Sequence, residues 1–316
     1  MTDTLHRIAA AALPRFRIRE PRDVRALDAA LSDDRGYAAY AIGQLERGQF
    51  EHSRFWLASG PTGSGAVSHS SALGRSLYAG GDPTAVDAIL SLHPGPASTY
   101  VTTASPEHLP VLERHYALRD VLRMQRMAVT RASFRPVPGA VRRLRALDVW
   151  ALNDLYALED SRNAYGPRQI EQGIYYGAYD DGLLVAVAGT HVVAPHYSMG
   201  VVGNVFTHPA YRGRGLATRV TSRVTEELFE RSCGLVALTV DQLNTPAVHA
   251  YRRLGYNPGA AVVEARARRR DRLGLAAWLR RAAAGRGTNR DGEREEDAAG
   301  RPLRATGDAP RGGATA

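Results

Sequence analysis

The sequence predicts a mixed α/β fold with a mostly antiparallel sheet flanked by helices. The chain has 316 residues, 44% of them hydrophobic, which is enough to fill two cores of ordinary size. In its second half, a hairpin signal at 180–182 is followed by strand, helix, strand, helix and strand patterns. The first half shows a loosely similar order of elements.

A first α/β domain is predicted for residues 1–135. Its elements are expected as helices at 24–31 and 37–45, a strand at 54–58, a helix at 83–92 capped by Asp82, a strand at 99–103, a helix at 107–115 and a strand at 121–129. Clusters rich in glycine, serine and proline at 59–65 and 93–97 predict turns.

A joint containing prolines, at 134–139, precedes a second predicted domain at 142–270. The first helix of this domain is expected at 147–158, on the spacing of Leu147, Trp150, Leu155 and Leu158. The later elements are expected as strands at 175–179 and 183–193 around Asp180-Asp181-Gly182, a strand at 199–207, a helix at 215–231, a strand at 235–240, a helix at 246–254 and a strand at 260–267.

The end of the chain, residues 271–316, is rich in small and charged residues. A short helix is expected at 273–279. From 285 to 316 only Leu303 is a large apolar side chain, so this stretch cannot offset its ordering entropy and is predicted to be disordered.

All 41 basic side chains are arginines, and the absence of lysine excludes several chemistries. Schiff-base nucleophiles, Ser-Lys dyads and the lysine of a phosphate-binding Walker loop all need an ε-amine. The formal net charge of +9 is unevenly distributed. Residues 266–316 hold 13 arginines and 7 acidic residues, against 28 and 25 in the rest of the chain. The body of the protein is therefore almost balanced in charge.

Cysteine content and hydropathy restrict the location of the protein. The only cysteine, Cys233, excludes an internal disulfide and a Cys-rich metal site, and no metal is expected. The apolar run at 8–13 is too short for a signal sequence or a membrane span, and no run of about 18 apolar residues occurs elsewhere. We therefore expect a cytoplasmic protein without a membrane partner.

The segment 203–217 carries the clearest chemical signal, because a predicted strand turns through glycines directly into a helix. Gly213 and Gly215 allow unusual backbone torsions, and the first amides of the helix are free to meet an anion such as a pyrophosphate. Such turns also occur as plain tight connections. The dinucleotide fingerprint G-x-G-x-x-G is not completed, since Thr218 stands at its last position.

Two motifs in this order resemble the GCN5-related N-acetyltransferase (GNAT) family. The first is Arg212-x-x-Gly215-x-Ala217, which is similar to the coenzyme A pyrophosphate loop of that family. The second is Asn244-x-x-Ala247-x-x-x-Tyr251-x-x-x-Gly255-Tyr256, after the strand at 235–240. The resemblance covers about residues 142–267.

The resemblance implies that acetyl-CoA lies between strands 199–207 and 235–240, which splay apart in the family. The coenzyme contacts it implies are Val205, Phe206, Thr207, Arg212, Gly213, Arg214, Gly215, Leu216, Ala217, Asn244 and Tyr251. Tyr251 would protonate the departing thiolate, and Asn244 would contact the pantetheine or a water. Structural roles are the alternatives, a packing aromatic for Tyr251 and a helix cap for Asn244.

The general base is not identified by the resemblance. Many family members carry a glutamate on the strand before the loop, but 199–207 contains no carboxylate. The substitutes considered are Asn204 through a water, His191, His196, Glu159 and Asp160. His208 matches a variable position of the motif, and water itself is a further acceptor of the amine proton.

The first half of the chain lacks the R-x-x-G-x-G/A run, yet its end at 116–129 resembles the close of a degenerate acetyltransferase half. Two-half chains of this kind are known in the FR47-like and glycine N-acyltransferase groups. We therefore expect a tandem arrangement in which only the C-terminal half binds coenzyme A. The alternative is an unrelated α/β domain.

The sequence thus predicts an acetyl-CoA-dependent N-acetyltransferase that transfers the acyl group directly to an amine of a small molecule or of a peptide or protein N-terminus. One alternative is a catalytically weak acyl-CoA sensor or scaffold. Nucleic-acid binding through 266–272 is the other, but few aromatics interleave there and the acidic cluster at 293–297 opposes it, so no nucleic-acid partner is expected. Monomer and homodimer remain open.

Overall fold

A computed structural model of the chain describes residues 16–72, 74–159, 165–271 and 273–283. The predictions for the run at 8–13, for Asp160 and for disorder at 285–316 concern residues outside these ranges. Within the described ranges, no helix combines the length and the apolar character that a bilayer crossing requires.

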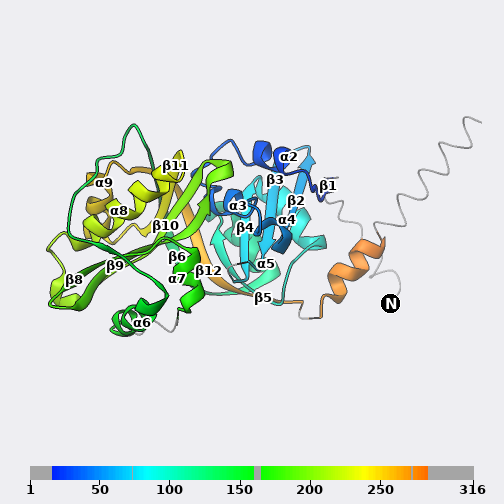
Figure 1. Ribbon diagram of the computed structural model, residues 1–316. Helices are drawn as coiled ribbons and strands as arrows, with labels where there is room; N and C mark the ends of the chain where they lie inside the picture. The colour runs from blue at the N-terminus through cyan, green and yellow to red at the C-terminus, as the bar shows by residue number, and fades with distance from the viewer. Residues whose placement is uncertain (1–15, 73, 160–164, 272, 284–316) are drawn as a thin grey trace, which may run out of the picture.

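In the described residues, ten α-helices and β-strands follow one another in the same order in each half (Figure 1). The N-half contains β1 (Arg17–Arg19), α2 (Val24–Ala30), α3 (Ala39–Gly43), β2 (Ser53–Gly60), β3 (Gly63–Ser70), β4 (Ser76–Gly81), α4 (Pro83–Leu92), β5 (Ser98–Thr103), α5 (Leu109–His115) and β6 (Tyr116–Thr130). The C-half contains β7 (Arg142–Arg143), α6 (Val149–Ala157), α7 (Pro167–Gln172), β8 (Tyr176–Asp180), β9 (Leu183–Ala194), β10 (Met199–Thr207), α8 (Leu216–Glu230), β11 (Leu235–Asp241), α9 (Thr245–Arg253) and β12 (Asn257–Arg269). A last helix spans 275–283. The expectation of two related halves is confirmed.

A single twelve-stranded sheet runs through both halves, in the order β1-β2-β3-β4-β5-β12-β6-β11-β10-β9-β8-β7. The pairs β4–β5 and β10–β11 are parallel, and the other pairs are antiparallel. This arrangement confirms the predicted fold class. The last strand of each half completes the sheet of the other half, because β12 pairs with β5 and β6 pairs with β11. The predicted domain limits stay a prediction, since strands from both halves alternate at the centre.

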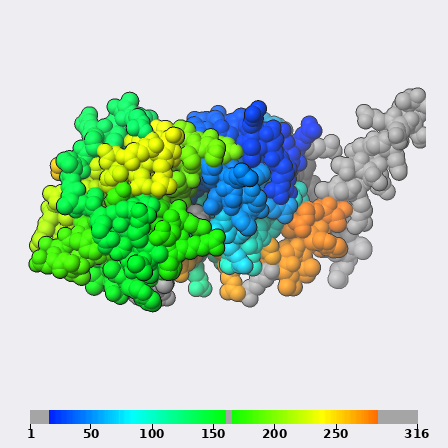
Figure 2. All heavy atoms as spheres, in the orientation of Figure 1, coloured from blue at the N-terminus to red at the C-terminus, as the bar shows by residue number. Residues whose placement is uncertain are grey.

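The strand exchange also joins the hydrophobic cores. Met127 of β6 lies in the core of the C-half beneath α8, and Ala265 of β12 lies in the core of the N-half beneath α4. A third cluster packs α2 and α3 against β10 and β11, with Ile42 and Met199 both fully buried. Figure 2 shows the result as two lobes in direct contact, with the helix at 275–283 (orange) lying on the N-half.

Local turn and cap predictions are confirmed at two places. The Asp82 carboxylate caps α4 by accepting hydrogen bonds from the amides of Thr84, at 2.8 Å, and Ala85, at 3.0 Å. Asp181 and Gly182 have φ of 44° and 82°, as the hairpin between β8 and β9 requires.

Two sequence expectations were wrong. The glycine- and serine-rich stretch from 59 is mostly strand, because β3 gains hydrogen bonds from β2 on one side and β4 on the other. In and next to α6, Leu147, Trp150 and Leu158 do not form the core face, since they are 92, 76 and 50% exposed. The buried face of that helix is instead made by Val149, Leu152, Leu155 and Tyr156.

Candidate active site

β10 and β11 part soon after they begin. Their parallel pairing ends at Val201 and Ala237, although β10 continues to Thr207 and β11 to Asp241. A β-bulge between Gly203 and Phe206 bends β10 at this point. Beyond the last pair, the edge of β10 that faced β11 has no strand partner, so its backbone N–H and C=O groups are available to a ligand.

The bulge is held by Asn204, which has a φ of +55°. Its side-chain Oδ1 accepts hydrogen bonds from the Tyr165 hydroxyl, at 2.7 Å, and from His191 Nε2, at 3.0 Å. Its Nδ2 donates to the Tyr175 hydroxyl at 3.0 Å, and its carbonyl accepts from Tyr156 at 2.5 Å. Both acceptor positions of the Asn204 Oδ1 are therefore used by protein groups, so this oxygen has none left with which to accept a hydrogen bond from a water.

His191 connects this cluster to the N-half. Because its Nε2 donates to the Asn204 oxygen, its Nδ1 is the acceptor of the Tyr40 hydroxyl, 2.5 Å away. Burial lowers the pKa of His191, so the ring is neutral. Burial also raises the pKa of Tyr40 to about 12. Tyr40 belongs to α3, so a side chain of the first half reaches the edge of the site in the second.

The loop from β10 to α8 ends in an unblocked helix N-terminus. Gly213 and Gly215 have φ of 78° and 73°, and no atom lies within 4 Å of the position that a Cβ would take on either residue. Gly215 is the N-cap of α8 and leaves the first turn without a side-chain cap. The free amides and the positive end of a 15-residue helix are suited to an anion, and the open space gives a phosphate room to approach.

Arg212 braces this loop. Its guanidinium donates to the Thr207 carbonyl at 3.3 Å, forms an ion pair with Glu159 and lies 5.9 Å from the centre of the Phe206 ring. Arg214 lies over the ring of Tyr211 at 4.7 Å. The guanidinium groups of both arginines therefore contact other protein groups. The backbone amides of the loop remain as the groups that can bind an anion.

Tyr251 and Asn244 occupy the two ends of α9. Tyr251 is only 7% exposed and lies in the core of the C-half, with its ring 6.1 Å from that of Tyr256. Burial raises the pKa of Tyr251 to about 12, so its phenol keeps its proton at neutral pH. Asn244 is exposed and caps α9 by accepting from the Ala247 amide at 3.2 Å.

The remaining residues considered as a base are also engaged. The side chain of His196 is 76% exposed and paired with Glu46. Glu159 holds Arg212, and His208 accepts a hydrogen bond from the Ala210 amide. Among the described residues, no group of three or more His, Cys, Asp or Glu side chains is arranged to hold a metal ion.

Sequence reasoning missed the tyrosines that surround Asn204. Two come from α3 and α6, which pack against β9, and two come from the loops on either side of α7. No local spacing signals such a cluster. The residues concerned are Tyr40, Tyr156, Tyr165 and Tyr175.

Known proteins share both the sequence pattern and the fold. A family model described as Acetyltransferase (GNAT) family matches residues 142–256. Over 84 residues the chain is 37% identical to a mycothiol acetyltransferase of Catenulispora acidiphila, an alignment that covers 24% of this chain and 27% of that protein. The match thus spans about a quarter of the curated relative.

Solved structures agree over a larger part of the chain. A GCN5-related N-acetyltransferase from Kribbella flavida superposes with a TM-score of 0.51 at 23% identity, covering 73% of this chain and 95% of that one. A Drosophila protein reaches 0.57 at 14% identity, covering 79% and 98%. At these identities the likeness shows the fold. The match to the GNAT acetyltransferase family is therefore carried by residues 142–256, and the likeness in fold extends over most of the chain.

Proposed function

We propose that the protein is an acetyl-CoA-dependent N-acetyltransferase that transfers the acetyl group directly to an amine. The observation that carries this proposal is the parting of β10 and β11 after Val201 and Ala237, next to a loop that leads into an uncapped helix. A gap between strands with free backbone groups suits the amides of a pantetheine arm. The neighbouring helix N-terminus suits the pyrophosphate.

The residues of the C-half divide the binding of the acyl donor between them. Backbone groups of Val205, Phe206 and Thr207 would pair with the pantetheine. The pyrophosphate would lie on the amides of the loop and first helical turn, at Arg212, Gly213, Arg214, Gly215, Leu216 and Ala217. Asn244 caps α9 and would contact the pantetheine from the opposite strand end.

When bound, acetyl-CoA supplies the thioester. The acceptor amine attacks the thioester carbonyl carbon, the new carbon–nitrogen bond replaces the carbon–sulfur bond, and amides near 205–207 would stabilise the oxyanion. Tyr251 would give its proton to the departing sulfur, a role for which a buried, neutral phenol is suited. No nucleophilic side chain is required, so both substrates bind before transfer.

We further propose that water accepts the proton lost by the amine. Asn204, His191, His196 and Glu159 all have protein partners in the structure. None of them is an unoccupied base. The rate should therefore rise with pH until the acceptor amine itself is largely neutral.

The N-half would form part of the acceptor site and not a second coenzyme site. Its α3 packs on β9 and β10, and Tyr40 contacts His191 there. This placement supports the proposed division into a coenzyme-binding part at 142–270 and an acceptor-shaping part before 135. The identity of the amine is left open.

The test is thiol release from acetyl-CoA over a panel of amines that includes amino acids, amino sugars, polyamines and peptides with free N-termini. We expect release that depends on one class of amine. Calorimetry with acetyl-CoA alone accompanies the assay. Binding without release across the panel would favour a coenzyme A sensor or scaffold, and absence of both would exclude the coenzyme assignment.

A further inference from the structure

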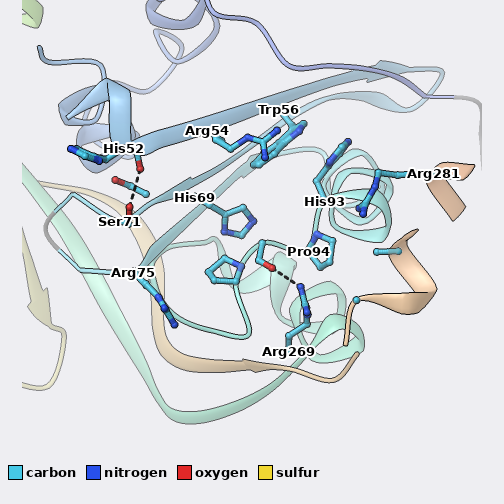
Figure 3. Close-up of a pocket in the computed structure, with 15 residues that line it drawn as sticks. His52, Arg54, Trp56, His69, Ser71, Arg75, His93, Pro94, Arg269 and Arg281 are labelled. Atoms are coloured by element: carbon cyan, nitrogen blue, oxygen red, sulfur yellow. Dashed lines mark hydrogen bonds between the residues drawn. The ribbon is translucent and has the colours of Figure 1, made fainter. Parts of the chain in front are cut away.

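A second site lies in the N-half, at the opposite end of α4 from its N-terminus. A cavity of about 640 Å³ is enclosed by the start of β2, the end of β3, the turn after α4 and the helix at 275–283 (Figure 3). Its volume is in the range of small-molecule sites. Coenzyme loops of this fold precede helices, whereas His93 and Pro94 of this cavity follow one, so the cavity is not a second copy of the coenzyme site.

Two residues that line this cavity, Trp56 and His69, carry buried polar atoms without partners. His69 is 7% exposed, and neither of its ring nitrogens has a hydrogen-bond partner in the described part of the protein. The indole Nε1 of Trp56, a residue that is 4% exposed, is also unpartnered there. Native proteins seldom leave such groups unpaired, because they lose their hydrogen bonds to water without replacement. Two neighbouring unpaired side chains at one cavity therefore indicate a ligand.

The charge around the cavity is positive. Arginines from four different segments contribute to its wall, namely Arg54, Arg75, Arg269 and Arg281. Glu20 neutralises Arg54 through two hydrogen bonds of 2.8 and 2.7 Å. No carboxylate of the described residues lies within 4.0 Å of Arg75 or Arg281, which bond to the Ser98 hydroxyl and the Leu92 carbonyl. None of the described lining residues is acidic.

The histidines add both a donor and an acceptor. Burial lowers the pKa of His69 to about 4, although the backbone of His93 acts in the opposite direction. His93, which stacks on Trp56 at 5.0 Å between ring centres, also has a pKa lowered by burial and by Arg281. A neutral imidazole offers one N–H and one lone pair. The best complement to His69 is thus a ligand that carries a hydroxyl beside its anionic oxygens.

We propose that this cavity binds a small organic anion that carries a carboxylate or a phosphate together with a hydroxyl group. Arg75 and Arg281 would meet the charge, and Trp56 and His69 would hydrogen-bond the oxygens. The site is separate from the cleft between β10 and β11. It is formed by the N-half, the last helix and Arg269 at the end of β12, and it does not depend on the proposed acetyl transfer.

Trp56 provides the readout. The exposed Trp150 and Trp278 are replaced by phenylalanine, so that Trp56 is the only indole in the chain. Citrate and glycerol 3-phosphate are then titrated separately while the fluorescence of Trp56 is followed. We expect a saturable change with at least one of the two, and the one that acts identifies the anionic group as carboxylate or phosphate.

Variants test the charge. Arg75→Gln together with Arg281→Gln should weaken binding about tenfold or more, since each loses a charge-assisted hydrogen bond. Both side chains are exposed, so folding should not be affected. The matched control is Arg25→Gln, on the exposed side of α2, which should leave the affinity unchanged.

Three results would overturn the proposal. The first is no saturable signal with either anion. The second is the same affinity in the double arginine variant and in the Arg25→Gln control. The third is displacement of the anion by acetyl-CoA in simple competition, which would mean that the site is not separate.

Discussion

The two halves share one order of elements but differ at the junction between the parallel strand pair and the helix that follows. In the N-half the junction from β4 to α4 is the single residue Asp82, whose carboxylate takes the free amides of the helix. In the C-half the junction runs from 208 to 215 and ends at Gly215, with no side-chain cap on α8. The same fold thus presents a closed helix end in one half and an open one in the other.

This difference explains why, under the proposed function, only the C-half would bind the coenzyme. A negative carboxylate at the N-terminus of α4 stabilises the helix and at the same time repels an anion from it. The missing loop also removes the backbone amides that would surround a pyrophosphate. The N-half instead contributes Tyr40 and its last strand, β6, to the neighbouring half.

The largest effect is expected from separating the halves. Pieces 16–138 and 139–283 would each lack the strand that completes its sheet, and residues such as Met127 and Ala265 would lose their buried positions. We expect neither piece alone to unfold cooperatively, and mixing to restore a cooperative transition. The measurement is thermal unfolding by circular dichroism. Independent transitions of the two pieces would contradict the importance of the strand exchange.

The next effect concerns the open helix end. Gly215→Glu places a side chain at a φ of 73° and a carboxylate among amides that we assign to a pyrophosphate. Acetyl-CoA affinity should fall by about 100-fold or more, equivalent to ~2.7 kcal/mol, as measured by calorimetry.

The matched control is Gly48→Glu. Gly48 also has a positive φ, of 82°, and open space around its Cβ position, but it lies in the N-half outside any proposed site. It should carry the same backbone strain and leave acetyl-CoA binding unchanged. Equal losses in the two variants would attribute the effect to strain and not to the loss of an anion site.

Removal of the Tyr251 hydroxyl should affect turnover more than binding. Tyr251→Phe is expected to lower kcat by about 100-fold, the usual contribution of a general acid, with little change in acetyl-CoA affinity. Wild-type activity should show no loss from ionisation of this phenol until the pH approaches 12.

Tyr256→Phe is the control for Tyr251. Tyr256 is a buried neighbour whose hydroxyl bonds to Thr225 at 2.7 Å. Its removal should cost about 1 kcal/mol of stability and leave kcat unchanged. An unchanged rate in Tyr251→Phe would leave Tyr251 as a packing residue only.

Whether a structural feature could be predicted from the sequence depends on how far apart in the chain the residues that determine it lie. Signals within a few residues were sufficient for the Asp82 cap, the Asp181-Gly182 hairpin and the positive φ of Gly213 and Gly215. The helix expected at 215–231 is present as α8, and Val220, Val224 and Leu228 on its inner face are fully buried. Each of these follows from the conformational preference or the spacing of neighbouring residues.

Long-range features could not be predicted in this way. The exchange of β6 and β12 depends on which strands pair across more than 100 residues, and β3 is held by its two neighbours although its glycines and serines disfavour a strand. The tyrosine partners of Asn204 lie 29 to 48 residues away in the sequence, so no local pattern indicates them. The sequence alone therefore left Asn204 as a residue that holds a water. Asparagine tolerates a positive φ better than most residues, and these contacts fix the side chain in that conformation.

The smallest effect is expected from removing the side-chain cap at the N-terminus of α4. Asp82→Ala removes the cap of α4 and should reduce the free energy of unfolding by about 1 kcal/mol at neutral pH. Hydrogen bonds from Thr84 and the amides of the first turn lower the pKa of Asp82 below its ordinary value. A carboxylate with a lowered pKa stabilises the fold above its unfolded-state pKa of about 4, and this stabilisation disappears as the pH falls through the folded-state value. The stability difference between Asp82→Ala and the wild type, measured by urea unfolding, should therefore shrink below about pH 4.

The variant should also gain no affinity for acetyl-CoA, because removing the carboxylate does not restore the loop. Binding of acetyl-CoA by the N-half of this variant would contradict this expectation. It would mean that the Asp82 carboxylate alone prevents coenzyme binding there, and that the longer 208–215 junction of the C-half is not required for binding.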